Sequence, residues 1–123
     1  MKKLFLIVVL AAVWAMPAAE ARHKMPEKWY QQQFCGGAQE VRLSDGTRVD
    51  CLTDEYAVEF DFAPKWAEAI GQSLHYAKMT KKKPGIVLIV ERRQWFKYVE
   101  IAKELCQKYG IKFELIELKT LQK

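Results

Sequence analysis

Five consecutive apolar residues, Ile86 to Val90, constrain the fold of this chain more than any other feature. An uninterrupted apolar run after a Lys-Pro-Gly loop is typical of a β-strand that is buried on both faces. A sheet built around such a strand needs helices packed against it. Amphipathic stretches with apolar residues at helical spacing flank the run, at 65–80 and 94–109. The run therefore predicts the α/β class.

The remaining elements are predicted from alternation and turn signals. Asp45-Gly46 and Asp54-Glu55 separate alternating segments and indicate two hairpin turns, and Gly110 caps a helix. The predicted helices span 26–34, 65–80 and 94–109, and the predicted strands span 40–43, 48–53, 56–62, 86–90 and 112–118. This order predicts an antiparallel meander followed by strand–helix–strand crossovers, which makes an α+β mixed sheet with helices on its faces.

Length and composition limit the function classes. A chain of 123 residues has room for a single domain, and a hydrophobic fraction of 50% argues against disorder. The net charge of +5 permits an anionic partner without requiring one, because it is far below that of proteins that coat DNA. Repeat arrays, coiled coils and multi-span membrane proteins are excluded.

Residues 1–21 have the pattern of a secretory signal peptide. Lys2 and Lys3 precede an apolar run from Leu4 to Met16, and Ala19-Glu20-Ala21 follows as a small-x-small cleavage site. The run is shorter than the roughly 20 residues that span a bilayer. We therefore expect export to the periplasm or beyond, no stable membrane insertion after cleavage, and a mature domain of residues 22–123 with a net charge of +4.

Export favours a disulfide, because the destination is oxidising. Of the three cysteines, Cys106 lies on the apolar stripe of the helix at 94–109 and reads as a buried thiol. Cys35 and Cys51 remain as the predicted pair. A closed loop of about 16 residues is worth roughly 3 kcal/mol in the chain-entropy model.

The second hairpin concentrates acidic side chains. In the strand at 56–62, Ala57, Glu59 and Asp61 share one face, and a two-residue turn at 54–55 places Asp50 opposite Glu59 and Arg48 opposite Asp61. Directly opposed carboxylates repel each other. A hard divalent cation such as Mg²⁺ or Mn²⁺ is one compensation. An ordinary salt-bridge cluster with Arg48 and Lys65 is the other.

The helix that follows adds polar groups near these carboxylates. Its apolar stripe is predicted to comprise Trp66, Ala67, Ile70, Leu74 and Ala77. Lys65, Glu68, Gln72 and Tyr76 recur at helical spacing on the opposite face. A metal that polarises a phosphoryl oxygen, a lysine that steadies charge and an amide that orients the substrate suit phosphodiester hydrolysis.

At these residues the chain resembles the PD-(D/E)XK nuclease superfamily, which has the restriction-endonuclease-like fold. The resemblance rests on Gly46-Thr47-Arg48-Val49-Asp50, Ala57-Val58-Glu59-Phe60-Asp61 and Gln72-Ser73-Leu74-His75-Tyr76. It implies an αβββαβ core, here extended by αβ. It also implies metal binding at Asp50 and Glu59, and catalytic or substrate support from Gln72 and Tyr76 through a QxxxY-like motif.

Two features of the resemblance leave alternatives open. The family lysine belongs at position 61, where this chain has Asp61. Lys65 could replace it, Asp61 could be a third metal carboxylate with Arg48 as its partner, or the site could be inactive. Glu40 matches an acidic residue that some members carry ahead of the meander, although strict alternation through the first hairpin puts Glu40 on the face of Cys51.

Three functions therefore remain open at this point. The first is an exported, metal-dependent nuclease acting on DNA or RNA, and the second is a nuclease-like fold that only binds nucleic acid or protein. The third is a structural envelope protein whose charged cluster is a salt-bridge network. Basic residues near Lys81 and at Arg92-Arg93 offer phosphate contacts or are solvated loop charge. Nothing in the sequence predicts an oligomeric state.

Overall fold

The structure is a computed structural model that describes residues 23–118. The expected signal peptide at 1–21 and the end of the chain at 119–123 lie outside these residues. The elements are α1 (Glu27–Phe34), β1 (Ala38–Arg42), β2 (Arg48–Leu52), β3 (Tyr56–Phe62), η1 (Ala63–Lys65), α2 (Trp66–Thr80), β4 (Lys83–Val90), η2 (Arg93–Trp95), α3 (Phe96–Tyr109) and β5 (Lys112–Glu117).

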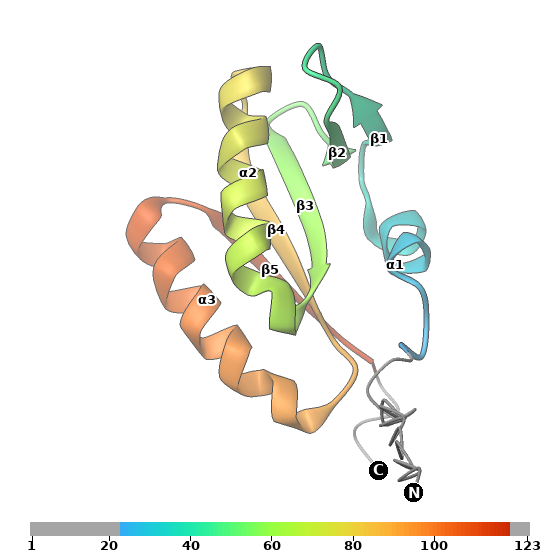
Figure 1. Cartoon of the computed structure of the whole chain (residues 1–123), viewed down its shortest axis with the longest axis vertical. Helices are drawn as coiled ribbons and strands as arrows, with labels where there is room; N and C mark the ends of the chain where they lie inside the picture. Colours follow the sequence, from blue (N-terminus) through green and yellow to red (C-terminus); the bar gives the residue numbers. More distant parts are fainter. Residues whose placement is uncertain (1–22, 119–123) are drawn as a thin grey trace, which may run out of the picture.

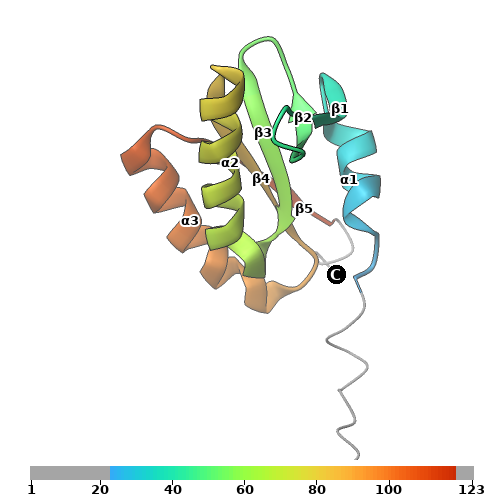
Figure 2. The same ribbon diagram turned by 45° about the horizontal axis from the view of Figure 1, so that its top comes forward.

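The five strands form one mixed sheet in the order β1-β2-β3-β4-β5. The β1–β2 and β2–β3 pairs are antiparallel, whereas the β3–β4 and β4–β5 pairs are parallel. Helices α2 and α3 lie side by side over β3, β4 and β5, and α1 lies on the side of β1 and β2 (Figures 1 and 2). The predicted α+β mixed sheet and its element order are confirmed.

Strand β4 is the centre of the core. Every side chain from Ile86 to Val90 is at most 3% exposed, as expected for a strand covered on both faces. The strand begins earlier than predicted, because Lys83, Pro84 and Gly85 pair in parallel register with Tyr56, Ala57 and Val58 of β3. These residues were expected to belong to a loop, and pairing with β3 overrides the Pro-Gly turn signal.

The first hairpin has a different register from the one its Asp-Gly signal predicts. Leu43 N–H donates to the carbonyl of Thr47 at 2.8 Å, which closes a three-residue loop with Gly46 at φ +87°. The residue opposite Cys51 is consequently Gln39. The placement of Glu40 on the face of Cys51 is wrong, because one extra loop residue exchanges the two faces of the strand.

The second hairpin follows its prediction only near its turn. Cys51 pairs with Val58 and Leu52 pairs with Ala57, and Thr53 N–H donates to the carbonyl of Tyr56 at 2.9 Å. The described β2–β3 ladder then stops, although β2 stays paired with β1 as far as Arg48. The hairpin of β1 and β2 therefore diverges from β3 on the side where Asp50 and Glu59 lie.

The predicted disulfide is confirmed. Cys35, directly after α1, is joined to Cys51 in β2, while Cys106 is a buried free thiol. This bond anchors α1 to the β1–β2 hairpin, and it is consistent with an exported protein. Within residues 23–118, no helix is long and apolar enough to cross a membrane.

Helix α2 faces the sheet with a different side from the one predicted. Its buried residues are Ala69, Ser73 and Tyr76, and Leu74 of the predicted apolar stripe is 45% exposed. The hydroxyl of the buried Ser73 is satisfied because it donates a hydrogen bond to the carbonyl of Ile70 at 2.8 Å. The rotation exposes a leucine and turns the Gln72–Tyr76 side of the helix toward the sheet.

Candidate functional site

Most of the predicted site residues surround one cavity between the hairpin, β3 and α2. The cavity has a volume of about 340 Å³. Its lining residues are Glu40, Gly46, Thr47, Arg48, Asp50, Glu59, Gln72 and Tyr76. The hairpin, β3 and α2 each contribute side chains, so the fold brings together residues that the sequence separates by more than thirty positions.

Asp50 and Glu59 form the acidic centre of this cavity. Their side chains hydrogen-bond to each other, and Glu59 is only 6% exposed. Burial, with the charge of Asp50 as the next cause, raises the pKa of Glu59 to about 10. Burial also raises the pKa of Asp50, although a backbone hydrogen bond from Phe60 opposes that shift. The pair therefore holds a proton at neutral pH.

One carboxylate oxygen of this pair receives no hydrogen bond from an ordinary donor. Glu59 Oε2 is buried and accepts none from an N–H or hydroxyl group within the described part of the chain. Buried polar atoms are normally satisfied, so an exception of this kind identifies a position at which a ligand atom can bind. Its location on the wall of an open polar cavity distinguishes it from an isolated packing defect.

Helix α2 contributes an amide and a phenol. Gln72 is half-buried at the cavity, and Tyr76 is 6% exposed and packs against Val49 and Ala57. Burial and the charges of Glu59 and Asp50 raise the pKa of the Tyr76 phenol to about 12. Tyr76 therefore stays protonated and can donate its hydroxyl into the cavity.

The β1–β2 hairpin contributes Glu40 and Arg48. Glu40 has a left-handed backbone with φ +49°, an uncommon conformation for a residue other than glycine. The neighbouring strand pairs are Gln39–Cys51 and Val41–Val49, so Glu40 of β1 lies opposite Asp50 of β2. The negative charge of Glu40 raises the pKa of Asp50, and the positive charge of Arg48 lowers it. The charge of Arg48 therefore acts on Asp50, whereas the charges that act on Asp61 are those of Glu27, Lys65 and Glu68.

Asp61 and Lys65 lie in a neighbouring cluster and do not line the cavity. The side chain of Asp61 hydrogen-bonds to Glu27 of α1, a residue that sequence reasoning did not select. Burial and the charge of Glu27 raise the pKa of Asp61 to about 7, while Lys65 opposes the shift. Glu68 adds a further negative charge. The positive charge of Lys65 thus acts on Asp61 and Glu27, which are outside the lining of the cavity.

This placement bears on the predicted metal site. Among residues 23–118, no three His, Cys, Asp or Glu side chains are grouped as a metal centre, so Asp50, Glu59 and Asp61 do not assemble into one. The pair of Asp50 and Glu59 remains. Mg²⁺ is commonly held by one or two carboxylates together with water and substrate phosphates. Two hard oxygen donors with an orphaned buried oxygen fit that requirement.

A polar contact joins the hairpin loop to α2 above the cavity. His75 Nε2 lies 2.7 Å from Asp45 Oδ2, and Asp45 Oδ1 accepts hydrogen bonds from the hydroxyl and N–H of Thr47. These hydrogen bonds, with a smaller contribution from His75, lower the pKa of Asp45 to about 2. The contact helps to fix the position of the hairpin wall relative to α2.

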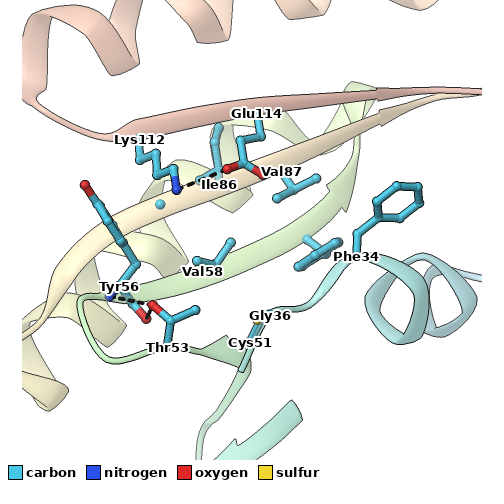
Figure 3. A pocket seen from close by; sticks show the side chains of 12 residues that line it. Phe34, Gly36, Cys51, Thr53, Tyr56, Val58, Ile86, Val87, Lys112 and Glu114 are labelled. Carbon is cyan, nitrogen blue, oxygen red and sulfur yellow. Dashed lines mark hydrogen bonds and ion pairs between the residues drawn. The ribbon is translucent and has the colours of Figure 1, made fainter. Parts of the chain in front are cut away.

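A second hollow lies on the opposite face of the sheet and has a different character (Figure 3). Its volume is about 240 Å³, and Val58 and Val87 are among the apolar side chains that line it. Lys112 lies over the ring of Tyr56 and pairs with Glu114 at 3.1 Å. The charges that line this hollow are already paired, so it does not provide the reactive groups of the acidic cavity.

Comparisons with known proteins give no relative from which a function could be proposed. The chain matches no family model, no curated protein and no solved structure.

Proposed function

We propose that this protein is an exported, metal-dependent nuclease that hydrolyses phosphodiester bonds of DNA or RNA. The observation that carries the proposal is the cavity at which Asp50, Glu59, Gln72 and Tyr76 meet. The same four residues account for the resemblance to the PD-(D/E)XK nucleases. Signal-peptide-like residues 1–21 and the Cys35–Cys51 disulfide support action in the periplasm or outside the cell.

Asp50 and Glu59 are the residues that would hold Mg²⁺ or Mn²⁺ in the proposed site. The metal would supply Lewis-acid activation of the phosphoryl group and of the attacking water. Gln72 offers an amide for orienting the substrate, and the protonated hydroxyl of Tyr76 can donate a hydrogen bond to a phosphate oxygen. Arg48 places a cation on the hairpin wall beside Asp50.

The burial of these groups supports a binding role over a purely structural one. A salt-bridge network would pair Asp50 and Glu59 with cations, yet their side chains bond to each other. In the same region α2 exposes Leu74 while it buries Tyr76 beside the two acids.

The test is a cleavage assay on protein recovered after export with its disulfide formed. Plasmid DNA, single-stranded DNA and RNA are incubated with Mg²⁺, Mn²⁺ or EDTA. Wild type is expected to cleave at least one substrate in the presence of metal, and Glu59→Gln is expected to lose at least a hundredfold in rate. Glu104→Gln makes the same chemical change at an exposed position on α3 and is expected to retain full activity.

The outcomes separate the candidates. Cleavage that persists in Glu59→Gln would come from a contaminant or from another site, and it would remove the proposal. Absence of cleavage by folded wild type on every substrate would also reject it.

A second candidate is a nuclease-like fold that binds nucleic acid without cutting it. Asp61 occupies the position of the family lysine, and Lys65 interacts with Asp61 and Glu27 instead of lining the cavity. This candidate predicts salt-sensitive binding of an oligonucleotide by wild type and no turnover with any metal.

A further inference from the structure

A basic cavity lies where the parallel strands β3 and β4 end. It has a volume of about 450 Å³ and is lined by residues that follow both strands. Four of them are His23, Lys65, Arg92 and Lys97, and no carboxylate is among the described residues that line it. In open α/β sheets, ligands commonly bind outside the carboxyl ends of the strands. A cavity of one charge sign at this position favours an anionic ligand.

Aromatic rings restrict the positions of two of these basic side chains. The guanidinium of Arg92 lies 5.3 Å from the ring centroid of Trp95, and Lys97 Nζ lies 5.0 Å from that of Tyr98. Such contacts hold long, flexible cations in a restricted set of positions. Less conformational entropy is then lost when an anion binds.

His23 is built into the wall of this cavity. Its ring stacks on Phe62 with 3.5 Å between centroids, and its Nδ1 lies 3.3 Å from Glu91. Glu91 is 1% exposed and also accepts hydrogen bonds from Tyr30 Oη at 2.7 Å and from the N–H groups of Lys24 and Met25. A buried carboxylate therefore fixes the segment that carries His23.

The basic cavity is within reach of the acidic cavity. Glu59 and Phe62 are three residues apart on β3, which corresponds to about 10 Å along a strand, and their side chains point to opposite faces of the sheet. Lys65 links the two regions, because it lines the basic cavity and acts on Asp61 and Glu27.

We propose that the cavity lined by His23, Lys65, Arg92 and Lys97 binds a backbone phosphate of the nucleic-acid strand whose scissile bond is held at Asp50 and Glu59. The identity of the ligand rests on the proposed function. The cavity gives the protein an affinity for the strand that does not depend on metal.

The test measures binding in EDTA, so that catalysis plays no part. A 15-nucleotide, 5′-fluorescein-labelled oligothymidylate is titrated with protein recovered after export, and fluorescence anisotropy is followed at several salt concentrations. Lys97→Glu is expected to weaken binding about tenfold and to make the salt dependence shallower by about one unit of slope. Gln94→Glu, which adds a negative charge to an exposed residue of the same cavity, is expected to act in the same direction.

Lys108→Glu is the matched control. Lys108 is also exposed on α3 and lies 5.5 Å over the ring of Tyr109, but it is outside the cavity. It is expected to change binding by less than twofold. Equal weakening by all three substitutions, or no binding by wild type, would overturn the inference.

Binding and cleavage can fail separately. Selective loss of binding in Lys97→Glu, with no cleavage by wild type in Mg²⁺, would uphold the basic cavity and reject the nuclease. Cleavage by wild type with unchanged binding by Lys97→Glu and Gln94→Glu would uphold the nuclease and reject the basic cavity.

Discussion

The backbone N–H of Phe60 donates a 2.9 Å hydrogen bond to Asp50 Oδ2. Phe60 lies beyond the last described β2–β3 pair, at the point where the antiparallel ladder has opened. Two residues further on, the N–H of Phe62 donates to the carboxylate of Asp61 at 3.0 Å. Carboxylates thus occupy the positions at which carbonyls of a neighbouring strand would accept. Asp50 therefore has a structural task besides the proposed chemical one.

Substitutions at Asp50 should distinguish these tasks. Asp50→Ala leaves the N–H of the buried Phe60 without its acceptor, and we expect a loss of about 1–3 kcal/mol in the free energy of unfolding. Asp50→Asn keeps an acceptor oxygen and should cost less than about 1 kcal/mol, while abolishing metal-dependent cleavage. Urea unfolding in EDTA measures the difference. Equal stability of the two variants would contradict the role assigned to this hydrogen bond.

Glu59→Gln should stabilise the protein above neutral pH. The folded-state pKa of Glu59 is about 10, well above the ordinary value of 4.5. The stabilising proton is therefore bound in both states below pH 4.5, and stability falls as pH rises from there toward 10. Glutamine imitates the protonated acid, so the variant should gain about 1–3 kcal/mol over wild type at about pH 8 and almost nothing at about pH 4.

Unfolding of wild type and Glu59→Gln across this pH range, in EDTA, gives the comparison. Glu104→Gln controls for the loss of one negative charge and is expected to track wild type at every pH. A gain that is constant with pH would contradict the raised pKa of Glu59 in the folded protein.

The orientation of α2 predicts an unequal response of its apolar residues. Leu74 is 45% exposed, so Leu74→Ala should cost less than about 1 kcal/mol. Ile86→Ala, in the buried strand β4, should cost about 2–5 kcal/mol. Similar losses at the two positions, measured by urea unfolding, would mean that the apolar stripe read from the sequence faces the core after all.

The cysteines should differ sharply in their response to reagents. Reduction of Cys35–Cys51 is expected to lower the free energy of unfolding by about 3 kcal/mol. Cys106 is buried, and desolvation raises its pKa to about 11, so the thiolate is scarce. Oxidised native protein should therefore show no rapid thiol reaction with a water-soluble disulfide reagent, and one thiol should react after denaturation. Rapid reaction of native protein would contradict the burial of Cys106.

Local patterns were sufficient for the elements and for most of the candidate site. The apolar run at Ile86–Val90 identified the central strand, and alternation at 56–62 gave the bounds of β3. The orientation of α2 about its own axis could not be predicted from the sequence, because it depends on which side of the helix meets Asp50 and Glu59. The predicted stripe has the greater apolar area, so periodicity favours a face on which Trp66 and Ile70 are half-buried against the core and Leu74 is exposed.

Two site features depended on tertiary structure. Glu40 joins the acidic cavity because the first loop has three residues rather than two, and an Asp-Gly pair is compatible with either length. Glu27 lies beside Asp61 because α1 packs along β3, and nothing local to Glu27 signals this. The Cys35–Cys51 pair was a long-range contact that could be predicted from the sequence, and it places the end of α1 against β2.

Because the β2–β3 ladder opens, the two sides of the acidic cavity differ in rigidity: one half belongs to the rigid part of the sheet and the other to the less constrained β1–β2 hairpin. Seven register pairs join β3 to β4 and six join β4 to β5, whereas two join β2 to β3. Glu59 thus stands on the rigid half, while Glu40, Arg48 and Asp50 lie on the hairpin. Besides the two β2–β3 pairs, the hairpin is held by the Cys35–Cys51 disulfide, the Phe60–Asp50 hydrogen bond, the packing of Val49 against Tyr76 and the Asp45–His75 contact. Backbone amides of the hairpin should exchange with deuterium well before those of β4. A ligand that bridges Asp50 and Glu59 would tie the two halves together and slow that exchange.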